Sequence, residues 1–280
     1  MRVQIASEPG RPGRANEDFA AVAPGLFVVI DGAGTPADVG TGCEHSVAWY
    51  ARHLGGAVLA AAVDAGTGLD EALAVSIERV NALHVRTCDL RHPGSPSATV
   101  ALARMDGGRL EHLVLSDAVV VLDRIGQSPA VVTDDRLTDV IARLDEPERS
   151  PAVGSDAHAR WLRDRVERLA AHRNRPGGFW VASTKPEAAG EALTGSSSLD
   201  ELNGVALLSD GASRLVDRFG LLGWPELLAV LRKGGPEELI ARTRDAEASD
   251  PVGARWPRGK AADDASAVWW AREDAVPRDL

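Results

Sequence analysis

Aspartates at the ends of apolar segments are the residues of this 280-residue chain that could carry out chemistry together. They are Asp18 in NEDFAAV, Asp31 in FVVIDGAG, Asp117 in LSDAVVV, Asp210 in LLSDGAS and the pair Asp263-Asp264 in KAADDASAVWW. Carboxylates gathered at one rim of a sheet would repel one another, and a hard divalent cation removes that penalty. Oxygen ligands without histidine or cysteine at metal-binding spacing favour Mg²⁺ or Mn²⁺ over Zn²⁺.

Two of these segments end in the same dipeptide. LFVVI runs into Asp31-Gly32, and VALLS runs into Asp210-Gly211. Asp-Gly is a favoured pair in tight turns, because glycine tolerates positive φ and aspartate bonds its own backbone. Each pair therefore has two interpretations, a plain turn or a carboxylate that a strand delivers to a metal site.

The hydrophobic pattern predicts which elements must position these aspartates. Strands are expected at 3–6, 19–23, 26–30, 97–105, 110–125 with a break at 116–117, 129–133, 177–183, 204–209 and 265–271. Apolar residues at helical spacing predict helices over 47–58 and 73–84, a third within 134–176, and two more over 224–233 and 236–247. Strands in meanders with helices in pairs indicate an α+β fold of antiparallel sheets layered with helices. We interpret residues 1–280 as one domain.

The composition of the chain argues against several classes of protein. The net charge is 31 − 41 = −10, which argues against sequence-independent binding to nucleic acid or to anionic membranes. The start of the chain shows no apolar leader and no segment approaches the ~18 apolar residues of a membrane span, so a cytoplasmic protein is expected. Cys43 and Cys88 stand at no familiar metal-binding spacing, so zinc gains no support, and His84 continues an apolar stripe as a core histidine would.

Six motifs in order carry a family resemblance: RANEDF, FVVIDGAG, SATVAL, LVLSDAVVVL, VALLSDGAS and DDASAVWW. From about Gly10 to Trp270 the chain resembles the type 2C metal-dependent serine/threonine protein phosphatases of bacterial type. The resemblance implies a four-layer α-β-β-α sandwich, two antiparallel sheets flanked by helix pairs, with residues 134–176 as a variable flap-type segment. It also implies a monomer that acts on a phosphorylated protein substrate.

The same resemblance implies a site with two Mn²⁺ or Mg²⁺ ions and a third, weaker one. Asp31 would bridge two ions and the Gly32 carbonyl would bind one of them. Asp210 and Asp263 would ligate the first ion, Asp18 would reach the second largely through water, and Asp117 would serve the third. Two metals polarise a shared water for attack on phosphorus, and a nearby arginine grips the phosphate with its guanidinium fork.

Several positions depart from the family pattern. The phosphate-binding arginine usually stands five residues before the first aspartate, where this chain has Gly13, and we assign the role to Arg14 rather than to Arg11. Ala33-Gly34-Thr35 follows Asp31-Gly32 without the histidine that many members carry. Because Asp18, Asp31, Asp210 and Asp263 are retained, we favour a protein phosphatase, with two alternatives: a catalytically silent phosphatase-like binding module, and an esterase acting on small phosphates.

Overall fold

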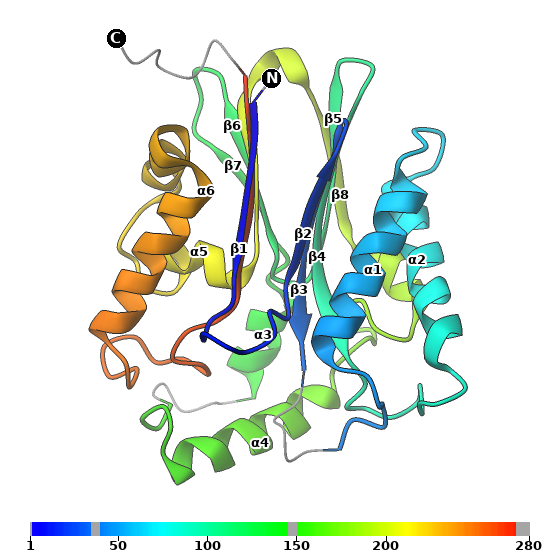
Figure 1. Cartoon of the computed structure of the whole chain (residues 1–280), viewed down its shortest axis with the longest axis vertical. Coiled ribbons are helices and arrows are strands. Elements are labelled where there is room, and N and C mark those ends of the chain that lie inside the picture. The colour runs from blue at the N-terminus through cyan, green and yellow to red at the C-terminus, as the bar shows by residue number, and fades with distance from the viewer. Residues whose placement is uncertain (1, 35–39, 145–149, 273–280) are drawn as a thin grey trace.

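The computed structural model describes residues 2–34, 40–144 and 150–272, which form two antiparallel five-stranded sheets packed face to face (Figure 1). The first sheet has the strand order β1-β10-β9-β6-β7, formed by Arg2–Glu8, Ala265–Ala271, Leu202–Leu208, Val119–Arg124 and Ala130–Val132. The second has the order β2-β3-β4-β5-β8, formed by Phe19–Ala23, Leu26–Ala33, Ser97–Asp106, Arg109–Leu115 and Leu193–Ser198.

Helix pairs cover the outer face of each sheet (Figure 1). Helices α1 (Val47–Ala62) and α2 (Leu69–His84) lie on the second sheet, and α5 (Asp210–Asp217) and α6 (Trp224–Ser249) lie on the first. Gly235, with φ of 73°, breaks α6 into the two helices that the sequence predicts. The expected α+β sandwich of four layers is thus confirmed. No helix among the described residues is long and apolar enough to cross a membrane.

Burial on both faces explains why the strands read as continuous apolar runs. Phe27, Val29 and Trp270 belong to the layer between the two sheets, whereas Trp269 packs with the residues of α5 and α6. Neighbouring residues of a strand point to opposite faces, so both tryptophans of β10 are buried in different layers. This double-sided core holds the strand ends in fixed positions.

One predicted strand is wrong. Residues 177–183 form only isolated bridges, of Phe179 with Arg173 and of Ala182 with Ala98. The edge of the second sheet is instead β8, Leu193–Ser198, which pairs antiparallel with β5. Its sequence, LTGSSS, lacks the apolar residues that mark a strand, because an edge strand is held here mainly by its backbone hydrogen bonds.

The segment 134–176 contains helices α3 (Arg136–Arg143) and α4 (Asp156–Ala170), which lie at the lower end of the sandwich in Figure 1, where β3 ends. The Asp134 amide donates to the Ser116 carbonyl at 3.2 Å. On the other side, His158 Nε2 lies 3.3 Å from the Arg258 carbonyl oxygen. Residues 145–149 of this segment fall outside the described residues. These contacts attach the segment to the loops beside Asp117 and Asp263.

Adjacent glycines of α1 offer a test of the contact between α1 and β2. A side chain at Gly55 would overlap the ring of Phe19, whereas Gly56 is exposed with open space around it. We expect Gly55→Ala to lower the free energy of unfolding by about 1–3 kcal/mol, because the overlap outweighs the gain in helix propensity. Gly56→Ala is the matched control and should raise it by about 0.5–1 kcal/mol. Urea unfolding of both variants measures the difference, and equal effects would contradict the packing.

Candidate metal centre

The aspartates predicted from the sequence come from five separate parts of the chain at one end of the sandwich. Asp31 lies in β3, Asp18 immediately precedes β2, Asp117 lies between β5 and β6, Asp210 begins α5 directly after β9, and Asp263 precedes β10. Their charges act on one another: Asp18, Asp210, Asp263 and Asp117 each raise the pKa of Asp31. The structure therefore brings all five to one acidic rim.

Neither Asp-Gly pair is a tight turn, so that interpretation is wrong. Asp31 and Gly32 pair with Thr99 and Ala98 in the β3–β4 ladder, and Asp210-Gly211 forms the first turn of α5. Glycine is needed for close approach instead. A Cβ at Gly32 would overlap the Glu17 carbonyl oxygen, and one at Gly211 would overlap the carbonyl oxygen of Asp264.

Asp31 and Asp18 are the two aspartates of the rim whose ionised forms are most disfavoured. Burial, followed by the charges of Asp18, Asp210 and Asp263, raises the pKa of Asp31 well above its usual range. Burial also raises the pKa of Asp18 to about 7. Both carboxyl oxygens of Asp18 are buried, and neither accepts a hydrogen bond of good geometry among the described residues, although the nearby hydroxyl groups of Ser266 and Ser209 lower its pKa in part. Such oxygens are costly unless a proton or a cation joins them.

Asp117 sits on a turn with unusual backbone geometry. Ser116, buried immediately before it, has φ of 66°, a left-handed conformation that glycine adopts more easily. The Asp134 amide donates to the Ser116 carbonyl and thereby connects this turn to the segment 134–176. Burial, together with the charge of Asp210, raises the pKa of Asp117 to about 6. Asp117 therefore belongs electrostatically to the rim.

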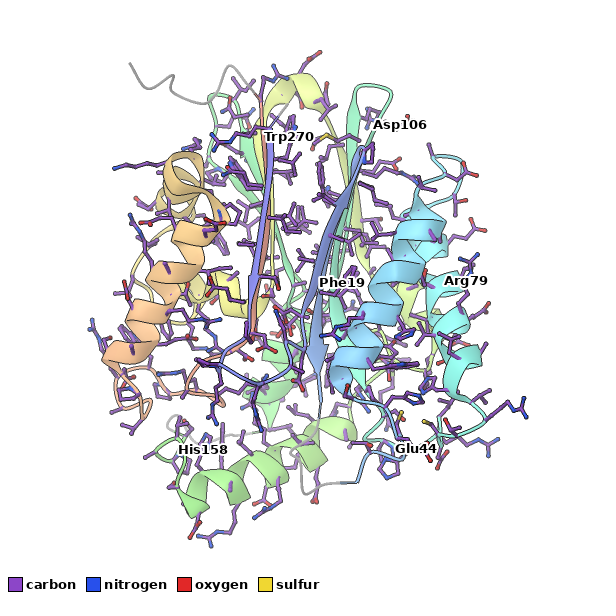
Figure 2. All side chains as sticks on the ribbon, viewed as in Figure 1. Phe19, Glu44, Arg79, Asp106, His158 and Trp270 are labelled. Atoms are coloured by element: carbon purple, nitrogen blue, oxygen red, sulfur yellow. The ribbon has the colours of Figure 1, made fainter. Side chains whose placement is uncertain are left out.

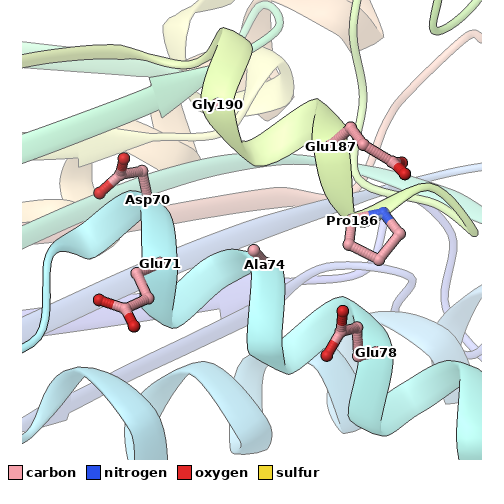
Figure 3. A pocket seen from close by; sticks show the side chains of 7 residues that line it. All are labelled: Asp70, Glu71, Ala74, Glu78, Pro186, Glu187 and Gly190. Carbon is pink, nitrogen blue, oxygen red and sulfur yellow. The ribbon is translucent and has the colours of Figure 1, made fainter.

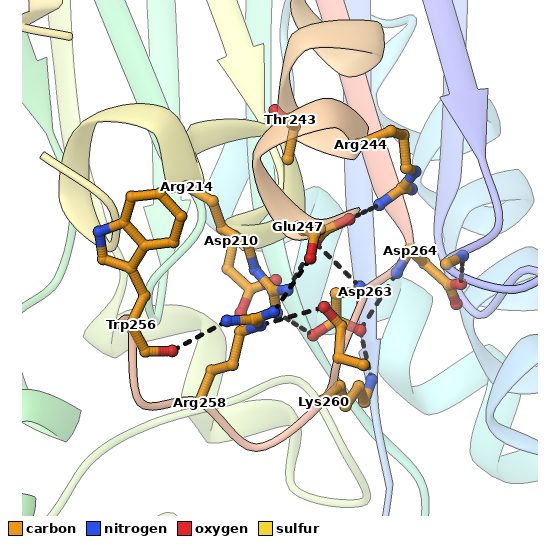
Figure 4. Close-up of polar contacts among 12 residues, drawn as sticks. Asp210, Arg214, Thr243, Arg244, Glu247, Trp256, Arg258, Lys260, Asp263 and Asp264 are labelled. Atoms are coloured by element: carbon orange, nitrogen blue, oxygen red, sulfur yellow. Dashed lines mark hydrogen bonds and ion pairs between the residues drawn. The ribbon is translucent and has the colours of Figure 1, made fainter. Parts of the chain in front are cut away.

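Two cations that the sequence analysis did not single out face Asp263 (Figure 4). Arg214 donates to Asp263 Oδ2 at 2.6 Å and to Glu247 at 2.8 Å, while Lys260 Nζ lies 2.5 Å from Asp263 Oδ1. Burial alone would raise the pKa of Asp263, but Lys260 and Arg214 hold it below its usual range. Arg214 stands one helical turn after Asp210, a spacing that could have revealed it.

Asp264 positions the loop that carries Arg14. Its two carboxyl oxygens accept hydrogen bonds from the amides of Gly10 and Glu17, both at 2.7 Å. This arrangement fixes the loop at both ends and leaves Arg14 exposed beside the rim, with its own amide bonded to the Arg11 carbonyl at 3.2 Å. The positive charge of Arg14 acts on the carboxyl group of Glu17.

The donor set of the rim fits divalent cations. Five carboxylates, Asp18, Asp31, Asp117, Asp210 and Asp263, face two cationic side chains, Arg214 and Lys260, so negative charge is in excess. The excess of negative charge is centred on Asp18, whose oxygens accept no hydrogen bond of good geometry, and on Asp31, whose pKa is raised. Asp263 is the most strongly paired of the five, since its two oxygens accept hydrogen bonds from Arg214 and Lys260.

A separate cavity of about 380 Å³ lies between α2 and the 3₁₀ helix Pro186–Glu191 (Figure 3). Its lining includes four carboxylates, from Asp70, Glu71, Glu78 and Glu187. Like charges disfavour a phosphate there. These four carboxylates are exposed, so they lack the desolvation that burial gives to Asp18 at the rim, and the acidic rim remains the candidate site.

Comparison with known proteins gives a likeness in structure but not in sequence. No protein-family model and no curated protein matches the chain. The serine/threonine phosphatase PstP/Ppp of Mycobacterium tuberculosis superposes with a TM-score of 0.59 at 18% identity, covering 96% of this chain and 97% of that one. Stp1 from Staphylococcus aureus gives 0.58 at 12% identity over 97% and 94%.

A third structure, the PPM Ser-Thr phosphatase MsPP of Mycobacterium smegmatis in complex with cacodylate, gives a TM-score of 0.55 at 18% identity, covering 96% of this chain and 97% of that chain. The similarity extends over nearly the whole of each chain, so it includes both sheets and both helix pairs. The chain therefore has the fold of the bacterial PPM-type serine/threonine phosphatases.

Proposed function

We propose that this protein is a metal-dependent phosphatase that hydrolyses phosphoserine and phosphothreonine in a protein substrate. The observation that carries the proposal is the acidic rim itself: five aspartates from separate parts of the chain converge at the end of this fold, and the two buried oxygens of Asp18 accept no hydrogen bond of good geometry. Oxygen donors of this kind suit Mn²⁺ or Mg²⁺. The neighbours in fold are serine/threonine phosphatases.

The ions would be held by the carboxylates of Asp18, Asp31, Asp117, Asp210 and Asp263 and by the Gly32 carbonyl. When bound, two such ions supply an activated water and neutralise charge on the phosphoryl oxygens. Arg14 would grip the phosphate with its guanidinium. Arg214 keeps Asp263 ionised, and Asp264 holds the Arg14 loop at the edge of the site.

We further propose that the segment 134–176 acts as a flap that selects the substrate. Its start is bonded to the Ser116 carbonyl beside Asp117, and α4 is bonded near Arg258, five residues before Asp263. A peptide whose phosphate reaches the rim would pass along this segment. The charged side chains of α4 would then contact residues of the substrate that flank the phosphorylated position.

A catalytically silent binding module is the second candidate. The observation that favours it is the Lys260–Asp263 contact at 2.5 Å, in which an internal cation occupies an expected metal ligand. The chain also has Ala33-Gly34 after the first Asp-Gly pair, and Thr35 lies outside the described residues. Hydrolysis of p-nitrophenyl phosphate and of a phosphothreonine peptide, with Mn²⁺ and then with a chelator, separates the two candidates. Mn²⁺ binding without any turnover would support the silent module.

Asp31→Asn tests the central ligand. We expect hydrolysis to fall by at least about a hundredfold, because a carboxylate that would hold the ions is removed. Calorimetric titration should show weaker or fewer Mn²⁺ sites, while circular dichroism should stay unchanged because the rim lies outside the apolar layers. Unchanged Mn²⁺ stoichiometry and affinity would refute the assignment of Asp31.

Arg14→Ala tests phosphate binding separately from metal binding. Loss of a charged hydrogen bond should lower kcat/KM roughly ten- to a hundredfold, mainly by raising KM. This corresponds to a loss of about 1.5–3 kcal/mol in transition-state stabilisation. Mn²⁺ affinity should remain close to that of the wild type. Arg11→Ala is the control, being the other exposed arginine of the loop. A larger effect from Arg11→Ala would reassign the role to Arg11.

The pH dependence of the metal-free protein tests the electrostatics of the rim. Asp18 and Asp117 have pKa values raised to about 7 and about 6, so between about pH 4 and pH 7 the native state binds protons that the unfolded chain has released. The free energy of unfolding should therefore fall as pH rises through this range, by at least about 1.4 kcal/mol. Mn²⁺ should abolish the loss. A metal-free protein whose stability instead rises over this range would show that the rim is not strained.

A further inference from the structure

A cluster of two cysteines and two histidines lies apart from the acidic rim, beside the α1–α2 pair. Cys43 and His45 come just before α1, His84 is the last residue of α2, and Cys88 lies in the turn that follows. One ligand atom from each of the four lies within 4.8 Å of all the others. Glu44, labelled in Figure 2, marks the place of the cluster.

The separations suit a tetrahedral ion. Cys43 Sγ lies 3.7 Å from His45 Nδ1 and 3.5 Å from His84 Nδ1, and Cys88 Sγ lies 3.3 Å from His45 Nδ1. Zinc bonds of about 2.3 Å to sulfur and about 2.0–2.1 Å to nitrogen separate tetrahedral ligand atoms by about 3.3–3.8 Å. The two sulfurs, 3.0 Å apart, need only a small movement to admit the ion. Both cysteines are free.

Charge and surroundings point to the same ligand. Two thiolates and two neutral imidazoles balance the charge of a divalent ion, so the site, in which His84 is buried and the other three residues are half-buried, carries no net charge. The Glu44 amide points at Cys88 Sγ at 3.4 Å, the kind of contact that supports a metal-bound thiolate. The Trp49 ring lies against His45, with ring centroids 4.1 Å apart, and 5.3 Å from that of His84. It holds both imidazoles toward the sulfurs.

The sequence analysis gave zinc no support and treated His84 as a satisfied core histidine. His84 is indeed buried, but its Nε2 has no hydrogen-bond partner among the described residues and its Nδ1 faces Cys43. Sequence spacing shows only two short pairs, Cys-x-His and His-x-x-x-Cys, separated by the whole of α1 and α2. The fold brings these pairs together.

We propose that this cluster is a structural zinc site, formed by Cys43, His45, His84 and Cys88. Two sulfur and two nitrogen donors in a tetrahedral arrangement favour zinc over the Mn²⁺ or Mg²⁺ of the rim. Four protein ligands leave no position open for substrate, so the ion would be structural rather than catalytic. It would fasten the entry of α1 to the exit of α2.

The test is the metal content of the full-length protein, purified without chelator and dialysed under reducing conditions. Mass spectrometry should find roughly one zinc per chain. Replacement by Co²⁺ should give the intense visible bands and the sulfur-to-cobalt charge-transfer absorption of a tetrahedral thiolate site. Cys88→Ser and His45→Asn should each reduce bound zinc to below about a tenth of an equivalent. His45→Asn supplies a second variant if Cys88→Ser fails to fold.

Two control variants separate this site from its surroundings and from the rim. His53→Gln alters an exposed histidine of α1 that stacks on Trp49 at 4.1 Å, and it should keep the zinc. Asp31→Asn should keep it too, since that change affects only the rim. The proposal is overturned by any of three results: wild-type protein with neither zinc nor a cobalt spectrum, a Cys43–Cys88 disulfide found by thiol titration, or zinc that disappears with Asp31→Asn.

Discussion

Mutual repulsion among desolvated carboxylates is the constraint on which the rest of this structure depends. Asp31 and Asp18 are kept where ionisation is unfavourable, and neither has hydrogen bonds sufficient to compensate, so the surrounding fold must hold them. It does so because each aspartate lies in or next to a strand or helix that packs against an apolar layer. Arg214 and Lys260 offset the charge of Asp263, and the remaining excess is what a bound cation would neutralise.

Close backbone packing converts those separate strand ends into one rim. Gly32 of β3 admits the Glu17 carbonyl before β2, and Gly211 after β9 admits the carbonyl of Asp264 before β10, so neighbouring strand ends of each sheet lie close together. The same region contains Asp264, whose carboxylate ties Gly10 and Glu17 to the start of β10. The positions of the carboxylates are therefore fixed by packing within this chain.

The sequence predicted the parts of this molecule that burial specifies. Continuous apolar runs located most strands, helical spacing located α1 and α2, and Asp31 and Asp210 were found because they terminate such runs. Interactions without a local pattern were missed. Strand β8 is defined by its backbone hydrogen bonds to β5. Lys260 pairs with Asp263 through a contact within a loop. Cys43 and Cys88, 45 residues apart in the sequence, come together because α1 packs against α2. Rules of residue spacing detect metal ligands that lie in one element of secondary structure, whereas Cys43 and Cys88 lie in different parts of the chain.

The two proposed metal sites are connected through the start of α1. Val47, the first residue of α1, leaves no room for a Cβ at Gly32, the neighbour of Asp31. His45 stands only two residues before Val47, at the proposed zinc site. An ion that fixes His45 against His84 and Cys88 would therefore also fix the residue that packs beside the central carboxylate. A structural metal at that position would give the rim rigidity on the side where α1 begins, while Asp264 supplies it on the side of the Arg14 loop.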